Sequence, residues 1–158
     1  MPILNVKISQ PASAQMTQQV ANALLDLTTS ILRKARDVTA ITVSYVPPEQ
    51  WVVAGQTLAE QGKNSFYFDI KVTDSTNTKD EKAAYVAACF EVMAQLLPNL
   101  HQESYIFVHD VRADAYGYGG QTQEFRYVAA RIAADCGGLT IVLPYIIVRK
   151  MQQIGVSP

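Results

Sequence analysis

The sequence predicts an α+β fold in which two tandem β-α-β units form one four-stranded sheet with two helices on one face. The first observation is an internal repeat, because the 158-residue chain matches itself when it is shifted by about 65 positions. The second is that each copy has a strand-like, a helical and another strand-like pattern, in that order. With 49% hydrophobic residues, the chain has enough apolar side chains for the core of one domain.

The repeat is clearest at the end of each copy, where it needs no gap. At an offset of 65, Gly55-Gln56-Thr57 falls on Gly120-Gln121-Thr122, and Trp51 falls on Tyr116. The strand residues also align, Ile41 with Ile106, Val43 with Val108 and Val46 with Val111. Matching residue types in the same order and spacing indicate a duplicated unit. Within a single domain over 1–158, unit one is expected at about 2–62 and unit two at about 63–122.

Unit one begins with a strand at Ile3–Ser9, where apolar and polar residues alternate loosely. Ser13 is the expected N-cap of the following helix. That helix has one apolar stripe at helical spacing, formed by Val20, Leu24, Leu27 and Ile31. β-Branched residues predict a second strand at Ile41–Val46, and Pro47-Pro48 ends it.

Unit two repeats this order. Phe66–Thr73 is its first predicted strand. Thr78-Lys79-Asp80-Glu81 is a capping box, in which the threonine and glutamate side chains bond the free amides of a helix start. The apolar stripe of this helix is Tyr85, Cys89, Val92 and Leu96, and Pro98 follows it. Tyr105–Val111 is the second strand.

The topology follows from these elements. A strand–helix–strand crossover makes its two strands parallel and right-handed, so two units give four strands with both helices on one face. The opposite face still carries apolar and aromatic side chains. We therefore expect an oligomer that covers this face.

The C-terminal extension, about 123–158, lies outside the repeat. Helical spacing predicts a helix over Gln123–Cys136. The next segment, Leu139–Val148, is almost entirely apolar but too short to span a membrane. Pro144 would confine a strand there to an edge or a bulge. We expect this segment to be an extra strand or arm that packs on the domain or on a neighbour.

Charge and composition exclude several functional classes. The formal net charge is −1 with scattered Lys and Arg residues, so no nucleic-acid partner is expected. No apolar run is long enough to cross a membrane, and no signal-peptide pattern is present, which indicates a cytoplasmic protein. The two histidines and two cysteines lack metal-ligand spacing, and Gly117–Gly120 is not a phosphate loop. No metal, nucleotide or other cofactor is expected.

Pro2 heads the first strand and carries the functional hypothesis. Removal of Met1, which is usual before a small residue, would make Pro2 a free secondary amine. An α-amine has a pKa of about 8, and burial or a nearby cation lowers that pKa because both penalise the ammonium form. Such an amine can take and return a proton near neutral pH. Pro2 is therefore the expected general base and acid; a proline that merely starts a strand is the alternative.

Three features together resemble the tautomerase superfamily: Pro2 after the initiator Met, the duplicated strand–helix–strand unit, and the aromatic, glycine-containing segment that ends each unit. The resemblance covers about 2–122. Pro2-Ile3, followed by Val6 and Ile8, is similar to 4-oxalocrotonate tautomerase. The end of unit two, with Tyr105-Ile106, Asp110, Ala113 and Gly117, is similar to macrophage migration inhibitory factor. The resemblance implies a homotrimer of fused chains and catalysis by the N-terminal proline.

The resemblance also implies further site residues. Tyr105 corresponds to a pocket tyrosine that a neighbouring subunit contributes, and its alternative is a strand tyrosine packed in the core. Tyr116 and Tyr118 fall at pocket-lining positions. Arg36 falls near a pocket lysine, although a cation there would also complement a helix dipole. From its position after the last strand, Arg112 is a possible carboxylate clamp or a solvated loop arginine.

The chain also departs from the family. Family arginines are replaced by Ala12 and Thr42, the stretch 72–77 lacks the arginine pair of the dehalogenases, and Phe107 replaces an asparagine. The expected function is a keto–enol tautomerase that acts on a 2-oxo acid or a related carbonyl or carboxylate compound. The alternatives are addition of water to an unsaturated acid with Pro2 as the acid, as in hydratases and dehalogenases, or a non-catalytic trimeric binding protein.

Overall fold

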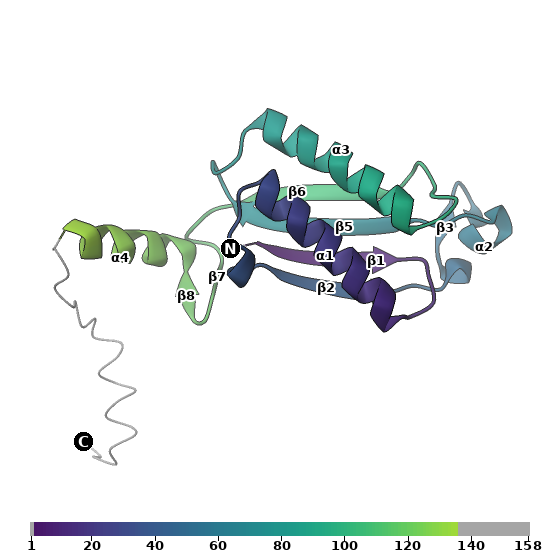
Figure 1. Ribbon diagram of the computed structural model, residues 1–158, viewed down its shortest axis with the longest axis horizontal. Helices are drawn as coiled ribbons and strands as arrows, with labels where there is room; N and C mark the ends of the chain where they lie inside the picture. The colour runs from purple at the N-terminus through teal and green to yellow at the C-terminus, as the bar shows by residue number, and fades with distance from the viewer. Residues whose placement is uncertain (1, 136–158) are drawn as a thin grey trace, which may run out of the picture.

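The computed structural model describes residues 2–135. Its centre is one four-stranded sheet in the order β2-β1-β5-β6, with helices α1 and α3 on one face (Figure 1). In unit one the main elements are β1 (Ile3–Ile8), α1 (Ala14–Ser30) and β2 (Ala40–Tyr45). In unit two they are β5 (Phe66–Thr73), α3 (Lys79–Leu96) and β6 (Tyr105–Val111). The predicted fold class is confirmed.

Strand pairing follows the predicted crossovers. β1 is parallel to β2 and β5 is parallel to β6, as a helical connection between two strands requires. The two units meet at the centre of the sheet, where β1 and β5 pair antiparallel with Val6 opposite Phe68. Each end of the sheet therefore gathers the start of one unit's first strand and the end of the other unit's first strand.

The helices begin where the sequence predicts, because side chains satisfy their free amides. Ser13 Oγ accepts a hydrogen bond from the Met16 amide at 3.2 Å. At α3, Thr78 Oγ1 accepts from the Glu81 amide at 3.2 Å, and the Glu81 carboxylate accepts from the Thr78 amide at 2.9 Å. This is the complete capping box.

One apolar core lies between the helices and the sheet. Its fully buried residues come from β1, β5, α1 and α3, so both units contribute to one core. On α1, Val20 and Leu24 of the predicted stripe are buried, and on α3 Tyr85 and Cys89 are buried. The expectation that Cys89 is a core residue is confirmed, and burial raises the pKa of its thiol to about 12.

Each unit also ends in a small hairpin and a helix. Unit one has β3 (Val52–Val53), β4 (Gln56–Thr57) and α2 (Leu58–Gln61), and unit two has β7 (Gly117–Tyr118), β8 (Gln121–Thr122) and α4 (Gln123–Asp135). Both turn residues have positive φ in each hairpin, 53° and 83° at Ala54-Gly55 and 57° and 75° at Gly119-Gly120. Such φ values are those of a type I′ turn.

The repeat continues into the helix that follows each hairpin. The Leu58 amide bonds the Trp51 carbonyl at 2.8 Å, and at the same offset the Gln123 amide bonds the Tyr116 carbonyl at 3.0 Å. The first turn of α4 is thus the counterpart of α2, four residues beyond the sequence match. The predicted helix at the start of the extension is confirmed, whereas the predicted strand Leu139–Val148 lies outside the described residues.

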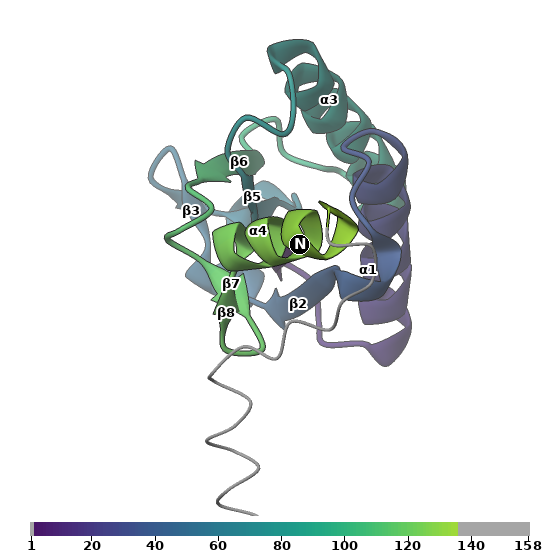
Figure 2. The ribbon, with the colours of Figure 1, turned by 90° about the vertical axis from the view of Figure 1, so that its left-hand side faces the viewer.

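α4 extends away from the sheet at the end where the chain begins (Figures 1 and 2). Large hydrophobic side chains on it are exposed, including Phe125, Tyr127, Val128 and Ile132. Among the described residues no helix is long and apolar enough to cross a membrane.

The sheet face opposite α1 and α3 carries both polar and aromatic side chains. Asn5 Nδ2 donates to Asp69 Oδ1 at 3.3 Å, and Lys71 forms an ion pair with the same carboxylate. Along the edge strand β6, the rings of Tyr105 and Phe107 stack at 6.3 Å, and both side chains are about half exposed. This exposed aromatic row is the feature that the sequence associates with an oligomer.

Candidate functional site at the N-terminal end of the sheet

Pro2 is buried at the start of β1, between the neighbouring strands β2 and β5. Its carbonyl accepts a hydrogen bond from the Ala40 amide at 3.2 Å, which places it beside the first residue of β2. On the other side, Ile3 pairs with Lys71 near the end of β5. The sheet therefore holds Pro2 at a fixed place at one end of its central strand pair.

A cavity of about 240 Å³ lies next to this strand end. Its wall consists of Asp37, Val38, Thr39, Ala40 and Tyr118. Ala40 is the residue that bonds the Pro2 carbonyl, and Tyr118 comes from the hairpin β7–β8 of the other unit. The predicted pocket residue Tyr118 is thus brought to the Pro2 end of the sheet by the fold.

A second cavity, of about 340 Å³, shares Tyr118 and includes Tyr116. The Tyr116 hydroxyl lies 2.7 Å from the Thr73 hydroxyl, at the last residue of β5. Because β5 runs antiparallel to β1, the end of β5 is adjacent to the start of β1. Tyr116 therefore also lies at the Pro2 end of the sheet.

Arg126, on the first part of α4, is a cation that the sequence analysis missed. Its guanidinium carbon lies 3.7 Å from the centre of the Tyr118 ring, and its Nη2 donates to the Tyr118 carbonyl at 2.8 Å. Its Nε is buried and has no hydrogen-bond partner among the described residues. The repeat could have pointed to Arg126, because at the offset of 65 this position corresponds to Gln61, four residues after the matched Gly-Gln-Thr segment of unit one.

The two arginines singled out from the sequence have carboxylate partners on the surface. Arg36 bonds Asp26 of α1 at 2.6 Å. Arg112 is 78% exposed and binds Asp114 through two hydrogen bonds, of 3.1 and 2.7 Å. These hydrogen bonds lower the pKa of the Asp114 carboxyl. Neither guanidinium lines the two cavities at the Pro2 end.

Tyr105 lies at the opposite end of the sheet from Pro2 within one chain. It pairs with Tyr67, whereas Ile3 pairs with Lys71, four residues farther along β5. Pro2 lies one position beyond Ile3, so at about 3.3 Å per residue Tyr105 and Pro2 are separated by roughly 16 Å along the strand direction alone. Only a second chain can bring a Tyr105 side chain to Pro2.

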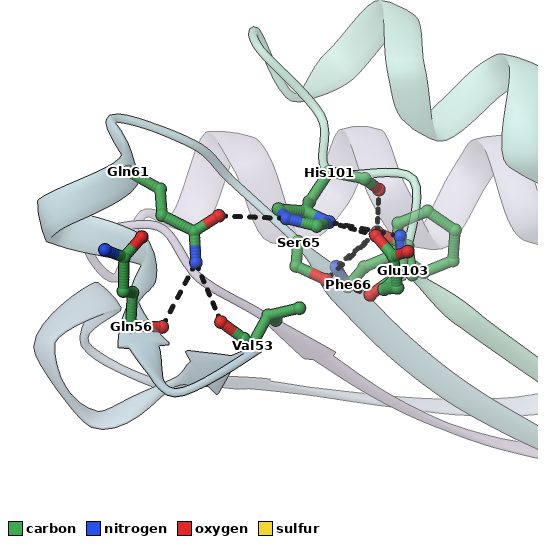
Figure 3. A network of polar contacts seen from close by, with 8 residues as sticks. Val53, Gln56, Gln61, Ser65, Phe66, His101 and Glu103 are labelled. Carbon is green, nitrogen blue, oxygen red and sulfur yellow. Dashed lines mark hydrogen bonds and ion pairs between the residues drawn. The ribbon is translucent and has the colours of Figure 1, made fainter.

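The opposite end of the sheet shows what the repeat builds where no chain terminus is present. Between the first strands of the two units the offset is 64, because Ile3 pairs with Ala40 as Tyr67 pairs with Tyr105, so Phe66 occupies the position of Pro2 and Ser65 continues the chain before it. Figure 3 shows His101 bonded to Gln61 on one side, at 3.0 Å, and paired with Glu103 on the other, at 2.6 Å. Hydrogen bonds between side chains thus close the start of β5 at this end, here called the closed end, while a separate cavity of about 360 Å³ lies beyond the end of β1 and is lined by residues of the segment 10–19.

The described residues contain no group of His, Cys, Asp and Glu side chains that could hold a metal ion. The described residues that gather at the Pro2 end are Pro2, Tyr116, Tyr118 and Arg126, of which the two tyrosines line the cavities and Arg126 lies against the Tyr118 ring. Tyrosine hydroxyls and a guanidinium beside a cavity can donate hydrogen bonds to a bound group that carries negative charge.

Comparisons with known proteins agree with the predicted fold. No family model and no curated protein matches the chain. Among solved structures, a fused 4-OT asymmetric trimer is 18% identical with a TM-score of 0.65, and the match covers 77% of this chain and 96% of that one. MIF2 of Leishmania major is 15% identical with a TM-score of 0.64, covering 77% and 97%.

A macrophage migration inhibitory factor-like protein from Entamoeba histolytica is similar in the same way, with 15% identity, a TM-score of 0.60 and coverage of 77% and 97%. These similarities show the tautomerase superfamily fold in its fused, double-unit form. Because identities of this size show the fold alone, the activity has to be argued from the residues of this chain.

Proposed function

We propose that the protein is a cofactor-independent keto–enol tautomerase of a 2-oxo acid or a related carbonyl compound, with Pro2 as the general base and acid. The observation that carries the proposal is the position of Pro2, buried at the end of the central strand and next to a cavity whose wall includes Tyr118. The tautomerase fold of the chain supports it.

The proposed reaction moves one proton between carbon and oxygen. The Pro2 nitrogen takes the proton from the carbon next to the carbonyl, and the electrons of the broken C–H bond form a C=C bond. The carbonyl oxygen becomes an enolate oxygen, and the prolinium returns the proton to it. A free amine with a pKa near the working pH can perform both steps.

The proposal requires that the working protein begins at Pro2. An amide nitrogen, which Pro2 has when a residue precedes it, is not basic and cannot take the proton. Removal of Met1 is therefore part of the proposal, and intact mass spectrometry of the purified protein tests it directly.

We also propose a homotrimer, in which Tyr105 of a neighbouring chain completes the site. Two observations support this: Tyr105 is exposed at the sheet end opposite its own Pro2, and solved structures with this fold include fused 4-OT trimers. Tyr105 would donate a hydrogen bond to the carbonyl or enolate oxygen. Size measurement in solution tests the trimer.

The decisive experiment measures conversion of phenylpyruvate enol to ketone by ultraviolet absorbance, with protein that lacks Met1. Pro2→Ala is expected to lower the rate about 10²- to 10⁴-fold, the usual contribution of a positioned acid–base group. Arg36→Ala is the matched variant at a residue already paired with Asp26, and it should leave the rate within about twofold. No rate above background in the wild-type protein would contradict the proposal and favour a binding protein.

A further inference from the structure

We propose that Arg126 binds the carboxylate of the substrate at the Pro2 end of the sheet, beside the Tyr118 ring. This inference rests on the proposed tautomerase function and adds to it the residue that would select anionic substrates. It is carried by three observations: the position of the guanidinium on Tyr118, the residue that replaces Arg126 in unit one, and the absence of a carboxylate partner for Arg126 among the described residues.

The first observation is geometric. Tyr118 is the one side chain shared by the cavity next to β1 and the cavity that includes Tyr116. The Arg126 guanidinium lies against this ring at 3.7 Å and is held there by its 2.8 Å bond to the Tyr118 carbonyl. A guanidinium fixed on a ring keeps in-plane N–H donors free to bind a carboxylate, and it has little side-chain freedom left to lose.

The second observation shows that the hydrogen bond made by Arg126 does not depend on its positive charge. At the equivalent place in unit one, Gln61 Nε2 donates to the Val53 carbonyl at 3.0 Å, just as Arg126 donates to Tyr118. A neutral amide is therefore sufficient to hold the hairpin. The positive charge of Arg126 is not needed for that hydrogen bond, so it calls for a different explanation.

The third observation concerns the partners of the arginines. In the described part of the chain, Arg33, Arg36 and Arg112 each pair with a carboxylate, and the exposed Arg131 instead donates to the Tyr127 hydroxyl. Arg126 is half-buried without such a pair, and its buried Nε has no acceptor there. A buried donor without an acceptor is unfavourable. A carboxylate bound at the exposed side of the guanidinium would supply the opposite charge and accept from its Nη donors.

The test compares a charged and an uncharged substrate. In Arg126→Gln, which reproduces the residue of unit one, kcat/KM for phenylpyruvate should fall about 10- to 100-fold, as expected for loss of a charged hydrogen bond. Methyl phenylpyruvate, the uncharged ester, should be converted as well as by the wild-type protein. Arg126→Lys should recover part of the phenylpyruvate rate. Arg131→Gln changes an exposed arginine on the same helix and should affect neither substrate.

Equal losses on both substrates, or no loss on either, would overturn the proposal. A second measurement uses the wild-type protein and needs no activity: 3-phenylpropanoate, an unreactive acid, should slow the modification of Arg126 by phenylglyoxal, with mass spectrometry as the readout. Unchanged modification would overturn the anion site. If phenylpyruvate is not converted at all but 3-phenylpropanoate protects Arg126, the tautomerase proposal fails while the binding site stands.

Discussion

The two ends of the sheet are built from the same elements and differ in what those elements carry. At one end, Pro2 directly precedes β1, and the neighbouring hairpin and helix supply Tyr118 and Arg126. At the other end, β5 starts with Phe66, and the equivalent hairpin and helix supply Val53 and Gln61. The backbone hydrogen bonds of the two hairpin–helix segments match, so the scaffold does not decide which end is reactive.

The difference between the ends lies in side chains and in the chain terminus. One end combines the buried Pro2, two tyrosines that line two cavities, and a cation that lies against one of the tyrosine rings. The other end is closed by hydrogen bonds among Gln61, His101 and Ser65 and their neighbours (Figure 3). Equivalent places in the two units therefore carry different side chains on the same backbone, and under the proposed function one of them serves chemistry and the other stability.

The largest expected effect comes from making the Pro2 end of the sheet resemble the Phe66 end. One or two residues added before Pro2, with no initiator Met removal, turn its nitrogen into an amide, as at Phe66. We expect phenylpyruvate ketonisation to fall about 10²- to 10⁴-fold, while the unfolding transition is nearly unchanged. Proteolytic removal of the added N-terminal residues should restore the rate. Full activity with those residues still in place would contradict a role for a free Pro2 nitrogen.

The next effect concerns stability at the closed end. Phe66 is fully buried, and its ring lies 6.1 Å from those of Phe68 and Phe90. Phe66→Ala should lower the free energy of unfolding by about 3–5 kcal/mol through lost apolar contacts and a cavity. Pro2→Ala should lower it by less than about 1 kcal/mol, because it removes little apolar surface. Denaturant titration measures the free energy of unfolding of both variants. Similar losses of stability would show that Pro2 contributes to stability as much as Phe66 does.

A smaller effect is expected at His101. His101→Gln disrupts the pairing with Gln61 and with Glu103, so the free energy of unfolding should fall by about 1–2 kcal/mol. The phenylpyruvate rate of the folded variant should not change. A lowered rate without lost stability would instead place the closed end of one chain next to the Pro2 site of another, and would sharpen the trimer proposal.

The smallest expected effect is a pH-dependent change in stability at the start of α3, which differs from the start of α1 by one residue of the cap. Glu81 completes the capping box of α3, whereas Met16 takes its place on α1. The Thr78 amide, the Asn77 amide group and Arg33 lower the pKa of Glu81 from its ordinary 4.5. The carboxylate therefore stabilises the fold above that ordinary pKa, and this stability is lost as the pH falls through the lowered pKa.

Accordingly, Glu81→Met should lower the melting temperature slightly at pH 7, since it removes the hydrogen bond that the Thr78 amide donates to the carboxylate in the capping box. The difference from the wild-type protein should shrink toward pH 3. Thermal unfolding followed by circular dichroism at the two pH values measures it. A difference that is the same at both values would show that the charge of Glu81 has no part in the cap.

Local patterns in the sequence were sufficient to predict most of the fold. Alternation and β-branched residues located the four strands of the sheet, and Ser13 and Thr78 marked the helix starts that the structure shows. The offset of 65 predicted that the two units share one topology, and strand pairing confirms it. These features depend on neighbours a few residues apart, which a sequence displays directly.

The site was predicted less completely because it depends on contacts between distant segments. Tyr116 and Tyr118 do lie at the Pro2 end, but the ion pairs that engage Arg36 and Arg112 arise from side-chain geometry that spacing does not reveal. Arg126 was missed because it lies just beyond the end of the sequence match. The equivalence of the hydrogen bonds made by Arg126 and Gln61 becomes visible only in the folded hairpins of the two units.

The junction between the units has a consequence for assembly. Four residues, 62–65, separate α2 from β5, and the antiparallel pairing of β1 with β5 joins the two halves of the sheet. A chain with a single unit would have to form that pairing with another molecule, at a rate and extent set by its concentration. Here a short tether gives the second unit a local concentration of the order of millimolar or more. The halves of the sheet therefore stay paired at any dilution, and only contacts between whole chains respond to protein concentration.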